Sequence, residues 1–570
     1  MKQVNNPSLF VAHYRPSDNT WQALEDHLFG VGALAAQFSG KLDLQEMGEL
    51  LGLLHDLGKY SQSFQVYVKS ASGALNQDED EDWVDAKNLK GKVDHSTAGA
   101  QFAWQVLGKA GSLETAQALA LCIASHHSGL IDCISAKADA FGEGLFARRM
   151  EKAQQRTHLD EVQRLAEPQL LQRCRDLLTD ARVTSKFQER LTLIGRSNQG
   201  HGSPVTIQQQ WGLLVRFLFS CLIDADRIDT ADFEKRRQRS FRPGGRYTNW
   251  TVLIERLERH LAHLPPTRPI DHLRQDISLH CQQAGARPGG IYTLTVPTGG
   301  GKTLASLRFA LHHAKERGLD RIIYIIPFTS IIDQNAKVVR DVLEPADALQ
   351  DRGRVVLEHH GSLTPEQQTW REKVLCENWD APIIYTTMVQ LLEALFGAGT
   401  RGARRMHQLS RAVLVFDEVQ TLPVKCAHLF NNAMNFLAEQ CSTTVLLCTA
   451  TQPLLHDVNP AKGSIRLASK PELMPDVGQL FKALQRVTVN DRRKVGGWTD
   501  QEVAELAAVE MQSSGSCLVI VNTKASARRI FELCASVLAS DAVFHLSTDM
   551  CPAHRKARLA TLLARLNEGL

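Results

Sequence analysis

The segment LLHDLGKYS, residues 53–61, places a histidine and an aspartate side by side, His55 and Asp56, at the end of an apolar stretch. Both groups are costly to bury without partners. They are therefore either a capped and satisfied pair at a helix end, or two ligands of one metal site whose other ligands lie elsewhere in the chain. Lys59, one turn later, faces the same side and is positioned to neutralise phosphate charge.

Other histidines and aspartates stand at or near the ends of further apolar, helically spaced stretches: His27 in LEDHLFG, His95 in VDHSTAG, His126 and His127 in IASHHSG, and Asp224 and Asp226 in LIDADRI. A single histidine at such a position is more often a satisfied core or capping residue than a ligand. Five histidines and these aspartates, spread over five expected helices, favour a metal centre instead. Imidazole and carboxylate ligands suit Mn, Fe, Co, Ni or Zn. With Asp56 as a bridge, two ions about 3.5–4 Å apart would activate water and stabilise the leaving oxygen of a phosphodiester.

A glycine-rich loop, TVPTGGGKTL at residues 295–304, directly follows an expected strand. The backbone amides of Gly299, Gly300 and Gly301 can crowd around phosphate oxygens, while Lys302 reaches the terminal phosphates and Thr303 holds magnesium. The first glycine of the usual pattern is replaced by Val296. The alternative is a glycine turn that merely joins a strand to a helix.

The segment VLVFDEVQTLP, residues 413–423, is an apolar strand that ends in Asp417 and Glu418. Asp417 would hold magnesium through water, and Glu418 would orient the attacking water. The alternative, an acidic strand end at the surface, is weakened by the phosphate loop a little over 100 residues earlier.

Three of these segments resemble the first signatures of superfamily 2 helicases: P-T-G-G-G-K-T, D-E-V-Q, and CTATQP at residues 448–453. IPFTSIIDQNA (326–336) and YTTMVQLL (385–392) resemble the segments that grip a single strand by its backbone. Together with the order H…HD…H…HH…D, the chain resembles the CRISPR-associated HD nuclease-helicases of type I interference systems. EHHGSL and LIDADRID resemble the forms of the I-C subtype.

The resemblance implies roles for residues. Metal ligands would be His27, His55, Asp56, His95, His126, His127 and Asp226, which aligns with the family's last metal helix, with Asp224 in reserve. Catalytic residues would be His55, Asp56, Lys59 and Glu418, and nucleotide-binding residues Thr298, Gly299, Gly300, Gly301, Lys302, Thr303 and Asp417. The implied cofactors are two divalent transition-metal ions (Mn, Co, Ni or Fe) and ATP with Mg. A surveillance complex with guide RNA would recruit the protein, which would nick the displaced single-stranded DNA and degrade it using ATP, in antiviral defence.

The elements that must position these residues change along the chain. Apolar residues recur at helical spacing up to about residue 230, whereas short apolar runs such as RIIYIIP and TTVLLCTA alternate with helical stretches from about residue 290. Such runs are typical of a parallel sheet covered on both faces. We therefore predict a multidomain protein: an all-α HD-type domain (1–233), a basic linker (234–250), a complete α/β RecA-like lobe (251–485) and the start of a second such lobe (486–570), whose first strand is expected at SCLVIVNT, 516–523. The acidic segment 76–88 is predicted to be a solvated loop.

The second lobe is expected to be incomplete, because no Q-x-x-G-R-x-x-R segment follows Asp549. Arginines of this kind contribute roughly 10³-fold or more to the rate in related NTPases. We therefore expect residues 1–570 to keep metal-dependent nuclease activity, to bind ATP weakly and to lack full motor activity.

Composition sets wide limits. The chain has 570 residues, 43% hydrophobic and 22% charged, with a net charge of +3, which is too small to indicate nucleic acid by itself. No run approaches the roughly 20 apolar residues of a membrane span, the N-terminus has no apolar signal core, and the 12 cysteines form no C-x-x-C pair. These features predict a cytoplasmic protein with reduced thiols and no membrane partner.

Two basic segments are candidates for single-strand contact: the six Lys and Arg residues from Lys235 to Arg246, and Arg401, Arg404 and Arg405. Each is equally compatible with a solvated surface. Two alternatives to the nuclease-helicase also stay open: an HD-type nucleotide phosphohydrolase with a regulatory ATP-binding half, and a non-catalytic DNA-binding fragment.

Overall fold

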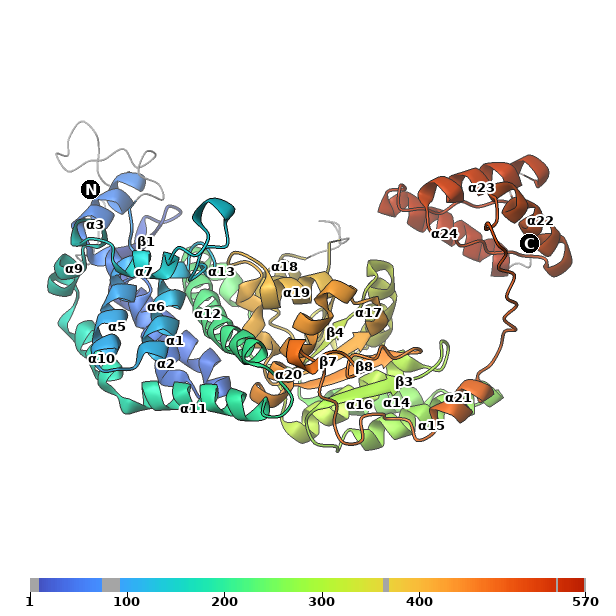
Figure 1. Ribbon diagram of the computed structural model, residues 1–570, viewed down its shortest axis with the longest axis horizontal. Helices are drawn as coiled ribbons and strands as arrows, with labels where there is room; N and C mark the ends of the chain where they lie inside the picture. The colour runs from blue at the N-terminus through green and yellow to red at the C-terminus, as the bar shows by residue number, and fades with distance from the viewer. Residues whose placement is uncertain (1–9, 74–92, 362–368, 540–541, 568–570) are drawn as a thin grey trace. The chain divides into compact units, whose positions relative to one another are not determined.

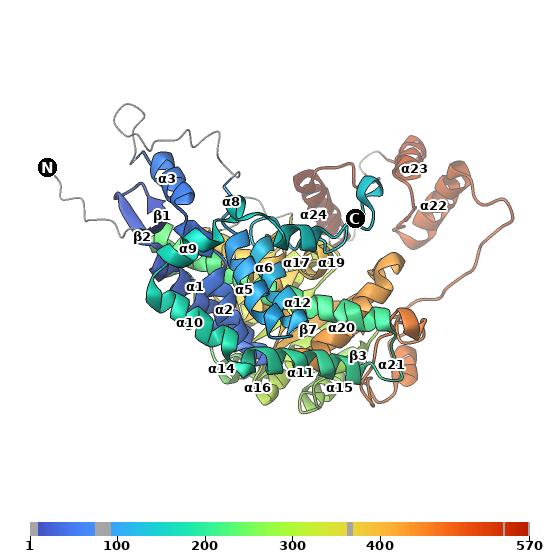
Figure 2. The same cartoon turned by 60° about the vertical axis from the view of Figure 1, so that its left-hand side comes forward.

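The computed structural model describes residues 10–73, 93–361, 369–539 and 542–567, so the predicted acidic loop at 76–88 lies outside the described residues. The chain divides into two compact units, Met1–Leu484 and Gln485–Leu570. The first combines a helical region with a parallel sheet, and the second is helical in its described part. Figures 1 and 2 show the helical region (blue to green) beside the sheet (yellow-green to orange) within the first unit.

The helical region is built on helices that cross at short distances. α1 (Leu24–Ser39) and α2 (Gln45–Leu54) approach closely because each helix has a glycine at the contact. A Cβ at Gly52 would lie 2.4 Å from the backbone nitrogen of Gly32. The long helix α12 (Pro204–Glu234, 31 residues) begins with a proline after Ser203, whose side chain accepts a hydrogen bond from the backbone of Thr206. The remaining elements of this region are β1 (Val11–Arg15), β2 (Thr20–Ala23), η1 (Gly40–Leu42), η2 (Leu57–Tyr60), α3 (Gln62–Ala71), α5 (Thr97–Lys109), α6 (Leu113–Ser125), η3 (Ala138–Ala140), α7 (Leu145–Met150), α8 (Gln154–Thr157), α9 (Leu159–Leu165), α10 (Pro168–Thr179), α11 (Ala181–Ser197) and α13 (Arg236–Arg239).

The sheet has six strands, all paired in parallel, in the order β3-β8-β7-β4-β6-β5. The prediction of a parallel sheet is thus confirmed. Most side chains of the strands are buried on both faces of the sheet. This is expected for a parallel sheet that is covered on two faces. The strands are β3 (Ile291–Thr295), β4 (Arg321–Ile325), β5 (Val356–His359), β6 (Ile383–Thr386), β7 (Ala412–Asp417) and β8 (Thr444–Thr449).

The two faces of the sheet belong to different cores. On one face, alternate strand residues such as Leu294 and Val415 pack with Leu253, Ile277 and Leu307 from the covering helices. On the other face, the intervening residues share one continuous core with the helical region, so the two parts of the first unit are joined by buried apolar contact. The first face is covered by α14 (Trp250–Ala262), α15 (Pro269–Ala284), α16 (Lys302–Arg317) and α17 (Thr329–Leu343), and the second core includes α18 (Trp370–Asn378), α19 (Met388–Phe396), η5 (Ala403–Leu409) and α20 (Ala427–Gln440).

The second unit departs from the prediction. The run expected as a strand at 516–523 has no regular structure, and Leu518 and Ile520 are 82% and 83% exposed. A strand needs a neighbouring backbone for its hydrogen bonds, and the described residues of this unit contain no other strand to supply one. Its small core, Ala504, Ala507, Ile530 and Cys534, joins α22 (Asp500–Ser514) to α23 (Lys524–Val537), and α24 spans Pro552–Asn567. The domain boundaries within the chain stay predictions.

Candidate metal centre and nucleotide site

The residues predicted to bind metal come from five segments of the helical region. His27 lies in α1, His55 and Asp56 follow α2, and His95 precedes α5. His126 and His127 follow α6, and Asp226 lies in α12. The loop after α2 can approach His95 only because residue 58 is glycine: a Cβ there would lie 2.3 Å from the carbonyl oxygen of His95. The structure brings all seven of these side chains together.

The seven side chains form two groups, in each of which the potential ligand atoms lie within 4.8 Å of one another: His27, His55 and Asp226, and Asp56, His95, His126 and His127. Asp56 lies between them. Its Oδ2 is 3.6 Å from Nε2 of His27 and 3.2 Å from Nε2 of His55. Its Oδ1 is 3.6 Å from Nε2 of His95 and 3.3 Å from Nε2 of His126. One carboxylate therefore faces two pairs of imidazoles, one pair on each oxygen.

The imidazole rings are oriented by hydrogen bonds on the side away from Asp56. Nδ1 of His55 contacts the carbonyl of Gly52 at 2.7 Å, and Nδ1 of His126 contacts the carbonyl of Ile123 at 2.8 Å. Nδ1 of His27 contacts the carboxylate of Asp229 at 2.8 Å. A ring that donates from Nδ1 keeps the lone pair of Nε2 for a metal ion, as second-shell partners of metal-bound histidines do.

The donor set fits divalent ions. Nε2 of His27, His55 and His126, and Oδ1 of Asp56, are buried and have no hydrogen-bond partner among the described residues, which is costly unless another group satisfies them. Donors bound to one ion at about 2.1 Å lie roughly 3.0–3.4 Å apart. The observed Nε2–Oδ distances around Asp56 run from 3.2 to 3.6 Å, close to that range. Imidazole nitrogens and carboxylate oxygens suit transition metals.

The pKa values of several groups in this cluster are shifted from their ordinary values. Although burial opposes it, Lys59 (Nζ 2.7 Å from Oδ2) and His55 hold the pKa of the Asp56 carboxyl well below its ordinary value. Burial disfavours a charge on His55, but the neighbouring carboxylates of Asp56 and Asp226 raise its pKa to about 10, so a bound cation would have to displace the Nε2 proton of this ring. Burial lowers the pKa of His95 to about 4, so this ring stays neutral near neutral pH. A neutral imidazole is the form that binds a metal ion.

Two residues behave differently from the predicted set. Asp224, the reserve ligand, points away from the centre and pairs with Arg404. Asp229 was not predicted, yet its carboxylate orients His27 and accepts a hydrogen bond from Gln22 (2.7 Å). The only signal for Asp229 is its position three residues after Asp226, one turn along the same helix.

The nucleotide-binding candidates meet at the carboxyl ends of three neighbouring strands. β3 leads into the loop with Thr298 and the three glycines, β7 ends at Asp417, and β8 lies between them. Gly299 and Gly301 have φ values of +87° and +81°, which glycine adopts without strain. Helix α16 begins at Lys302, so the loop presents backbone amides and a helix N-terminus, the arrangement that binds phosphate.

Acidic and basic groups are paired at this edge. Nζ of Lys302 lies 2.8 Å from Oε1 of Glu418 and 3.9 Å from Oδ1 of Asp417. Burial raises the pKa of Asp417, whereas that of Glu418 is lowered, against the effect of burial, by the hydrogen bond from Lys302. The hydroxyl of Thr303 lies 3.4 Å from Oδ1 of Asn335. The predicted phosphate-binding Lys302, the predicted magnesium ligand Asp417 and the predicted water-orienting Glu418 therefore lie together.

The helicase-like segment CTATQP (448–453) contacts the segment D-E-V-Q (417–420). The hydroxyl of Thr449, at the end of β8, donates a hydrogen bond of 2.6 Å to Oε1 of Gln420, in D-E-V-Q. The backbone N–H of Thr451 donates to the same hydroxyl at 3.0 Å. These contacts link the loop after β8 to the acidic loop after β7.

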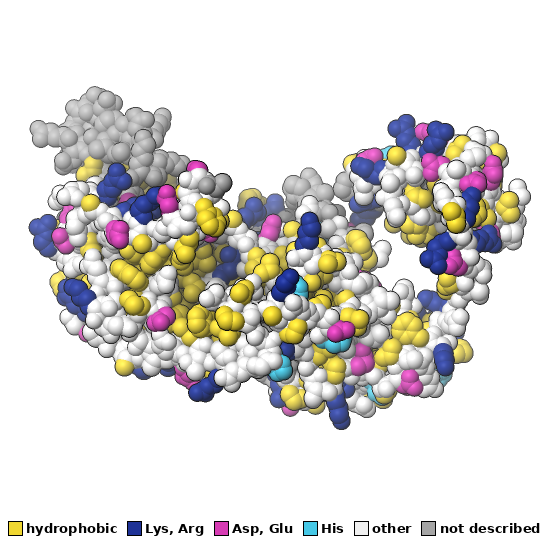
Figure 3. Space-filling view, in the orientation of Figure 1, with side chains coloured by type: hydrophobic (Ala, Val, Ile, Leu, Met, Phe, Trp, Pro, Cys, Tyr) yellow, Lys and Arg dark blue, Asp and Glu magenta, His cyan; other side chains and the backbone are white. Residues whose placement is uncertain are grey.

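The two basic segments predicted to contact a single strand differ in exposure: Arg404 and Arg405 are buried, whereas most basic residues between Lys235 and Arg246 are exposed. Arg404 and Arg405 are each only 4% exposed, so the interpretation of these two as strand contacts is wrong. Arg405 bonds to Gln390 and lies over the ring of Trp379. In the other segment, Arg242 pairs with Asp232. On the face shown in Figure 3, Lys and Arg side chains are scattered among acidic ones.

Helices that present a histidine–aspartate cluster, joined to a parallel sheet with a phosphate loop and an acidic strand end, define an HD-type domain fused to a superfamily 2 helicase lobe. Family models agree on both parts: residues 9–199 match the HD domain of Cas3, and residues 285–458 match the DEAD/DEAH box helicases. Both parts of the chain are thus similar to domains that occur in Cas3-type HD nuclease-helicases.

Among known proteins, the CRISPR-associated nuclease/helicase Cas3 of Haloferax volcanii is 26% identical over 457 residues, which cover 71% of this chain and 45% of that protein. The chain thus spans about half the length of this curated relative. The crystal structure of T. fusca Cas3 aligns with a TM-score of 0.57 at 16% identity, over 97% of this chain and 67% of that one. The T. fusca Cas3–AMPPNP structure aligns with a TM-score of 0.54 at 16% identity, over 93% and 63%. At this identity the structural likeness establishes the fold. Among the described residues, no helix is both long and apolar enough to cross a membrane.

Proposed function

We propose that this chain is a metal-dependent endo- and exonuclease for single-stranded DNA, fused to an ATP-dependent helicase motor, and that it degrades invading DNA in type I CRISPR defence. The observation that carries the proposal is the position of Asp56, whose two oxygens each face two imidazole Nε2 atoms. This arrangement suits a pair of cations that share one carboxylate. A bound pair supplies a nucleophile from water at neutral pH and stabilises charge on the departing oxygen of a phosphodiester.

The proposed ligands divide into two sets around the shared carboxylate: His27, His55 and Asp226 on one side, and His95, His126 and His127 on the other. Asp229 holds the ring of His27, and backbone carbonyls hold those of His55 and His126. The ammonium of Lys59, now against Asp56, is within reach of a phosphate that approaches the centre. Its positive charge would help to bind the DNA backbone. The ions themselves are proposed to be two of Mn, Co, Ni or Fe.

At the other site we propose ATP with magnesium. The amides of Gly299 to Gly301 and the N-terminus of α16 would hold the phosphates, with Lys302 exchanging its partner Glu418 for phosphate oxygens. Released in this way, Glu418 would orient the attacking water, while Asp417 and Thr303 would hold magnesium. Thr298, in the same loop, would border the phosphates.

Single-stranded DNA is the proposed substrate, and a type I CRISPR surveillance complex with its guide RNA is the proposed recruiting partner. Both proposals rest on the similarity of the chain to the HD domain of Cas3, to DEAD/DEAH box helicases and to a nuclease/helicase Cas3. A motor next to a nuclease can feed a single strand to the cutting site, which explains why the two sites occur on one chain.

Circular single-stranded DNA tests the proposal. The full chain is incubated with it in Mn²⁺, Co²⁺ or Ni²⁺, with and without ATP, and compared with His55→Ala and Asp56→Ala. His263→Ala is the matched control, because this exposed histidine lies at the end of α14 and its ring contacts the backbone carbonyl of Arg259. The proposal expects metal-dependent cleavage by the wild type and by the control, and none by the other two variants.

Each other result has a definite meaning. Hydrolysis of free nucleotides with the circle intact would replace the nuclease by a nucleotide phosphohydrolase. Tight DNA binding without cleavage in the presence of any of these metal ions would indicate a non-catalytic DNA-binding protein. Cleavage that survives Asp56→Ala would refute the role of the shared carboxylate.

A further inference from the structure

Helix α12 lies between the metal centre and the helicase lobe, and two aspartates face opposite ways from it. Residues two apart on an α-helix are separated by about 200°. Asp226 faces His27 and His55, with its Oδ1 3.7 Å from Nε2 of each. Asp224, fully buried, faces η5 of the lobe. The face of α12 toward the lobe is continuous, because Arg216, Ser220 and Asp224 follow one another at intervals of four residues.

Among the described residues, the polar side-chain partners of Asp224 come from the helicase lobe. Nε of Arg404 donates to its Oδ1 at 2.8 Å, and the side-chain amide of Asn378 donates to its Oδ2 at 3.0 Å. Nε2 of His407 lies 3.5 Å from Oδ2. A carboxylate with two hydrogen bonds of this kind, one from a guanidinium, has its charge and its oxygens satisfied in a site away from water.

Further contacts join the same elements. The ring of His407 in η5 stacks on Phe38 of α1, with centroids 4.7 Å apart, and its backbone N–H donates to the hydroxyl of Ser220 at 3.0 Å. Arg216 donates to the carbonyls of Ala394 and Gly397 at the end of α19, at 2.9 and 2.8 Å. η5 therefore contacts both α1, which carries His27, and α12, which carries Asp226.

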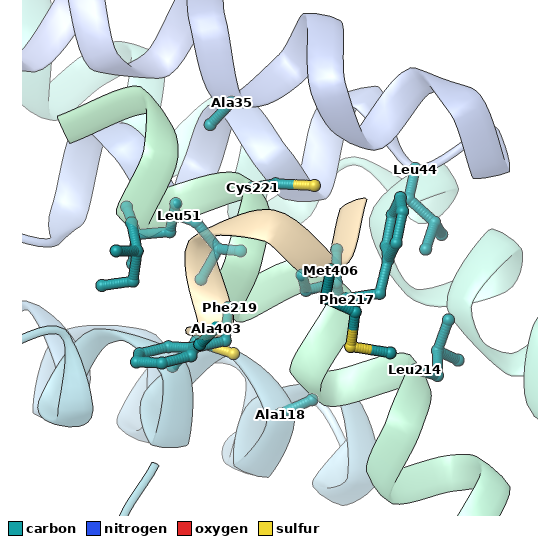
Figure 4. Packing of buried hydrophobic residues seen from close by; sticks show 14 of the residues in the cluster. Ala35, Leu44, Leu51, Ala118, Leu214, Phe217, Phe219, Cys221, Ala403 and Met406 are labelled. Carbon is teal, nitrogen blue, oxygen red and sulfur yellow. The ribbon is translucent and has the colours of Figure 1, made fainter. Parts of the chain in front are cut away.

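Apolar side chains surround these polar contacts of Arg216, Ser220 and Asp224 with the lobe, which we call the seam. Figure 4 shows Ala403 and Met406 of η5 among side chains from the helical region, with Phe217, Phe219 and Cys221 of α12 close by. All of them are buried in one core. The seam is therefore a closed interior contact, in which a side chain has little room to reorient.

We propose that Asp224 and Arg404 are positioning residues of the metal centre: the helicase lobe, through this buried pair, fixes the rotation of α12 and hence the place of Asp226. The inference rests on the proposed metal centre. Among the candidate ligands of that centre, Asp226 lies farthest along the sequence from the others. It is half a helical turn from Asp224. A carboxylate whose helix turns slightly no longer meets the distances that an ion requires, which are tight to about 0.2 Å. Loss of such outer partners typically weakens metal binding 10–100-fold.

The test measures Mn²⁺ binding to the full chain by isothermal titration calorimetry, for wild type, Asp224→Asn and Arg404→Met. Asp232→Asn is the matched control: it removes an ion-paired aspartate from the same helix, at a partly exposed position that contacts Arg242 instead of the lobe. Binding of a fluorescent ATP analogue reports separately on the helicase lobe, and circular dichroism reports on the helices.

The proposal expects two Mn²⁺ ions in the wild type and in the control. In Asp224→Asn and in Arg404→Met, one ion should bind 10–100-fold more weakly, while the other ion and the nucleotide bind as before. Unchanged binding of both ions in the folded variants would overturn the inference and leave the metal centre standing. Loss of both ions together with nucleotide binding would overturn it too, since the pair would then support the fold as a whole. A wild type that binds no Mn²⁺ would refute the proposed metal centre itself.

Discussion

Gly58 sets how closely the segment that carries Asp56 approaches His95 in the proposed metal centre, and replacing it with alanine should separate the two. The residue lies in η2, just after Asp56, and its Cα faces the backbone of His95. A Cβ at this position would lie 2.3 Å from the carbonyl oxygen of His95 and 2.7 Å from its Cα. Both neighbours are backbone atoms, so the contact cannot be relieved by turning a flexible side chain.

The size of the effect follows from these distances. Cβ atoms essentially never come within 3.0 Å of a heavy atom outside their own residue and its chain neighbours, so the two segments must part by at least 0.7 Å. Overpacking of this kind costs about 1–3 kcal/mol of stability. Nε2 of His95 starts 3.6 Å from Oδ1 of Asp56, and metal–ligand distances tolerate only about 0.2 Å. We therefore expect affinity for the ion on the His95 side to fall at least tenfold, or about 1.4 kcal/mol.

Urea unfolding and Mn²⁺ titration of Gly58→Ala measure both effects. Gly108→Ala is the matched control, because Gly108 lies in α5, the helix that follows His95, and a Cβ there would meet nothing within 4 Å. Glycine weakens a helix interior, so the control should be more stable than wild type by about 0.5 kcal/mol and should bind Mn²⁺ unchanged. A Gly58→Ala variant that matches wild type in stability and in both Mn²⁺ affinities would refute this steric reasoning.

Three further predictions concern other parts of the first unit. Asp229→Ala removes the carboxylate that orients His27, so Mn²⁺ affinity measured by calorimetry should fall about 10–100-fold; an unchanged affinity would rule out this role. Lys302→Ala removes the ammonium of the phosphate loop and should weaken binding of a fluorescent ATP analogue roughly tenfold, whereas Glu418→Gln should leave it intact; equal affinities in both variants would count against the site. Burial lowers the pKa of His313 to about 4 from an ordinary 6.5, so the unfolded chain binds the proton first, and the free energy of unfolding should fall by about 3 kcal/mol between pH 6.5 and 4. His313→Gln should lose that part of the slope in urea titrations, and a slope identical to wild type would exclude it.

Much of the fold, and the meeting of side chains at both proposed sites, could be predicted because the signals are local. An apolar run followed by G-G-G-K-T or by Asp417 and Glu418 predicts a strand that ends in a functional loop. The parallel pairing of β3, β8 and β7 then brings these loops together, since the carboxyl ends of parallel strands meet at one edge. The histidines at helix ends could be found in the same way, because a buried imidazole at such a place needs a partner.

Side-chain direction could not be predicted from the same signals. Asp224 and Asp226 both follow the apolar run of α12, and their spacing alone does not separate them; the preference for Asp226 came from the family resemblance. Which of them faces the metal centre depends on the rotation of the helix between two surfaces, a property of tertiary packing. Asp229 was missed for the same reason: its role depends on the position of His27, about 200 residues earlier in the chain.

The incorrect predictions share a cause as well. Basic residues in a glycine-containing loop, such as Arg404 and Arg405, look like an exposed phosphate-binding patch. Their partners, including Asp224 and Gln390, are distant in sequence and become visible only when the chain folds. The expected strand at 516–523 has the composition of a buried strand, but hydrogen bonding to neighbours decides whether such a run becomes one.

One scaffold holds both proposed sites. η5 pairs with α12 through Arg404, and the chain continues from η5 into β7, which ends at Asp417 beside Lys302. Coupling between two sites requires an element with two discrete arrangements. The seam between η5 and α12 is instead filled by buried apolar side chains and satisfied hydrogen bonds, which favour a single arrangement. We therefore interpret the seam as a rigid support: it keeps Asp226 in place whether or not a nucleotide occupies the phosphate loop, so that ion binding and nucleotide binding are independent events on a common frame.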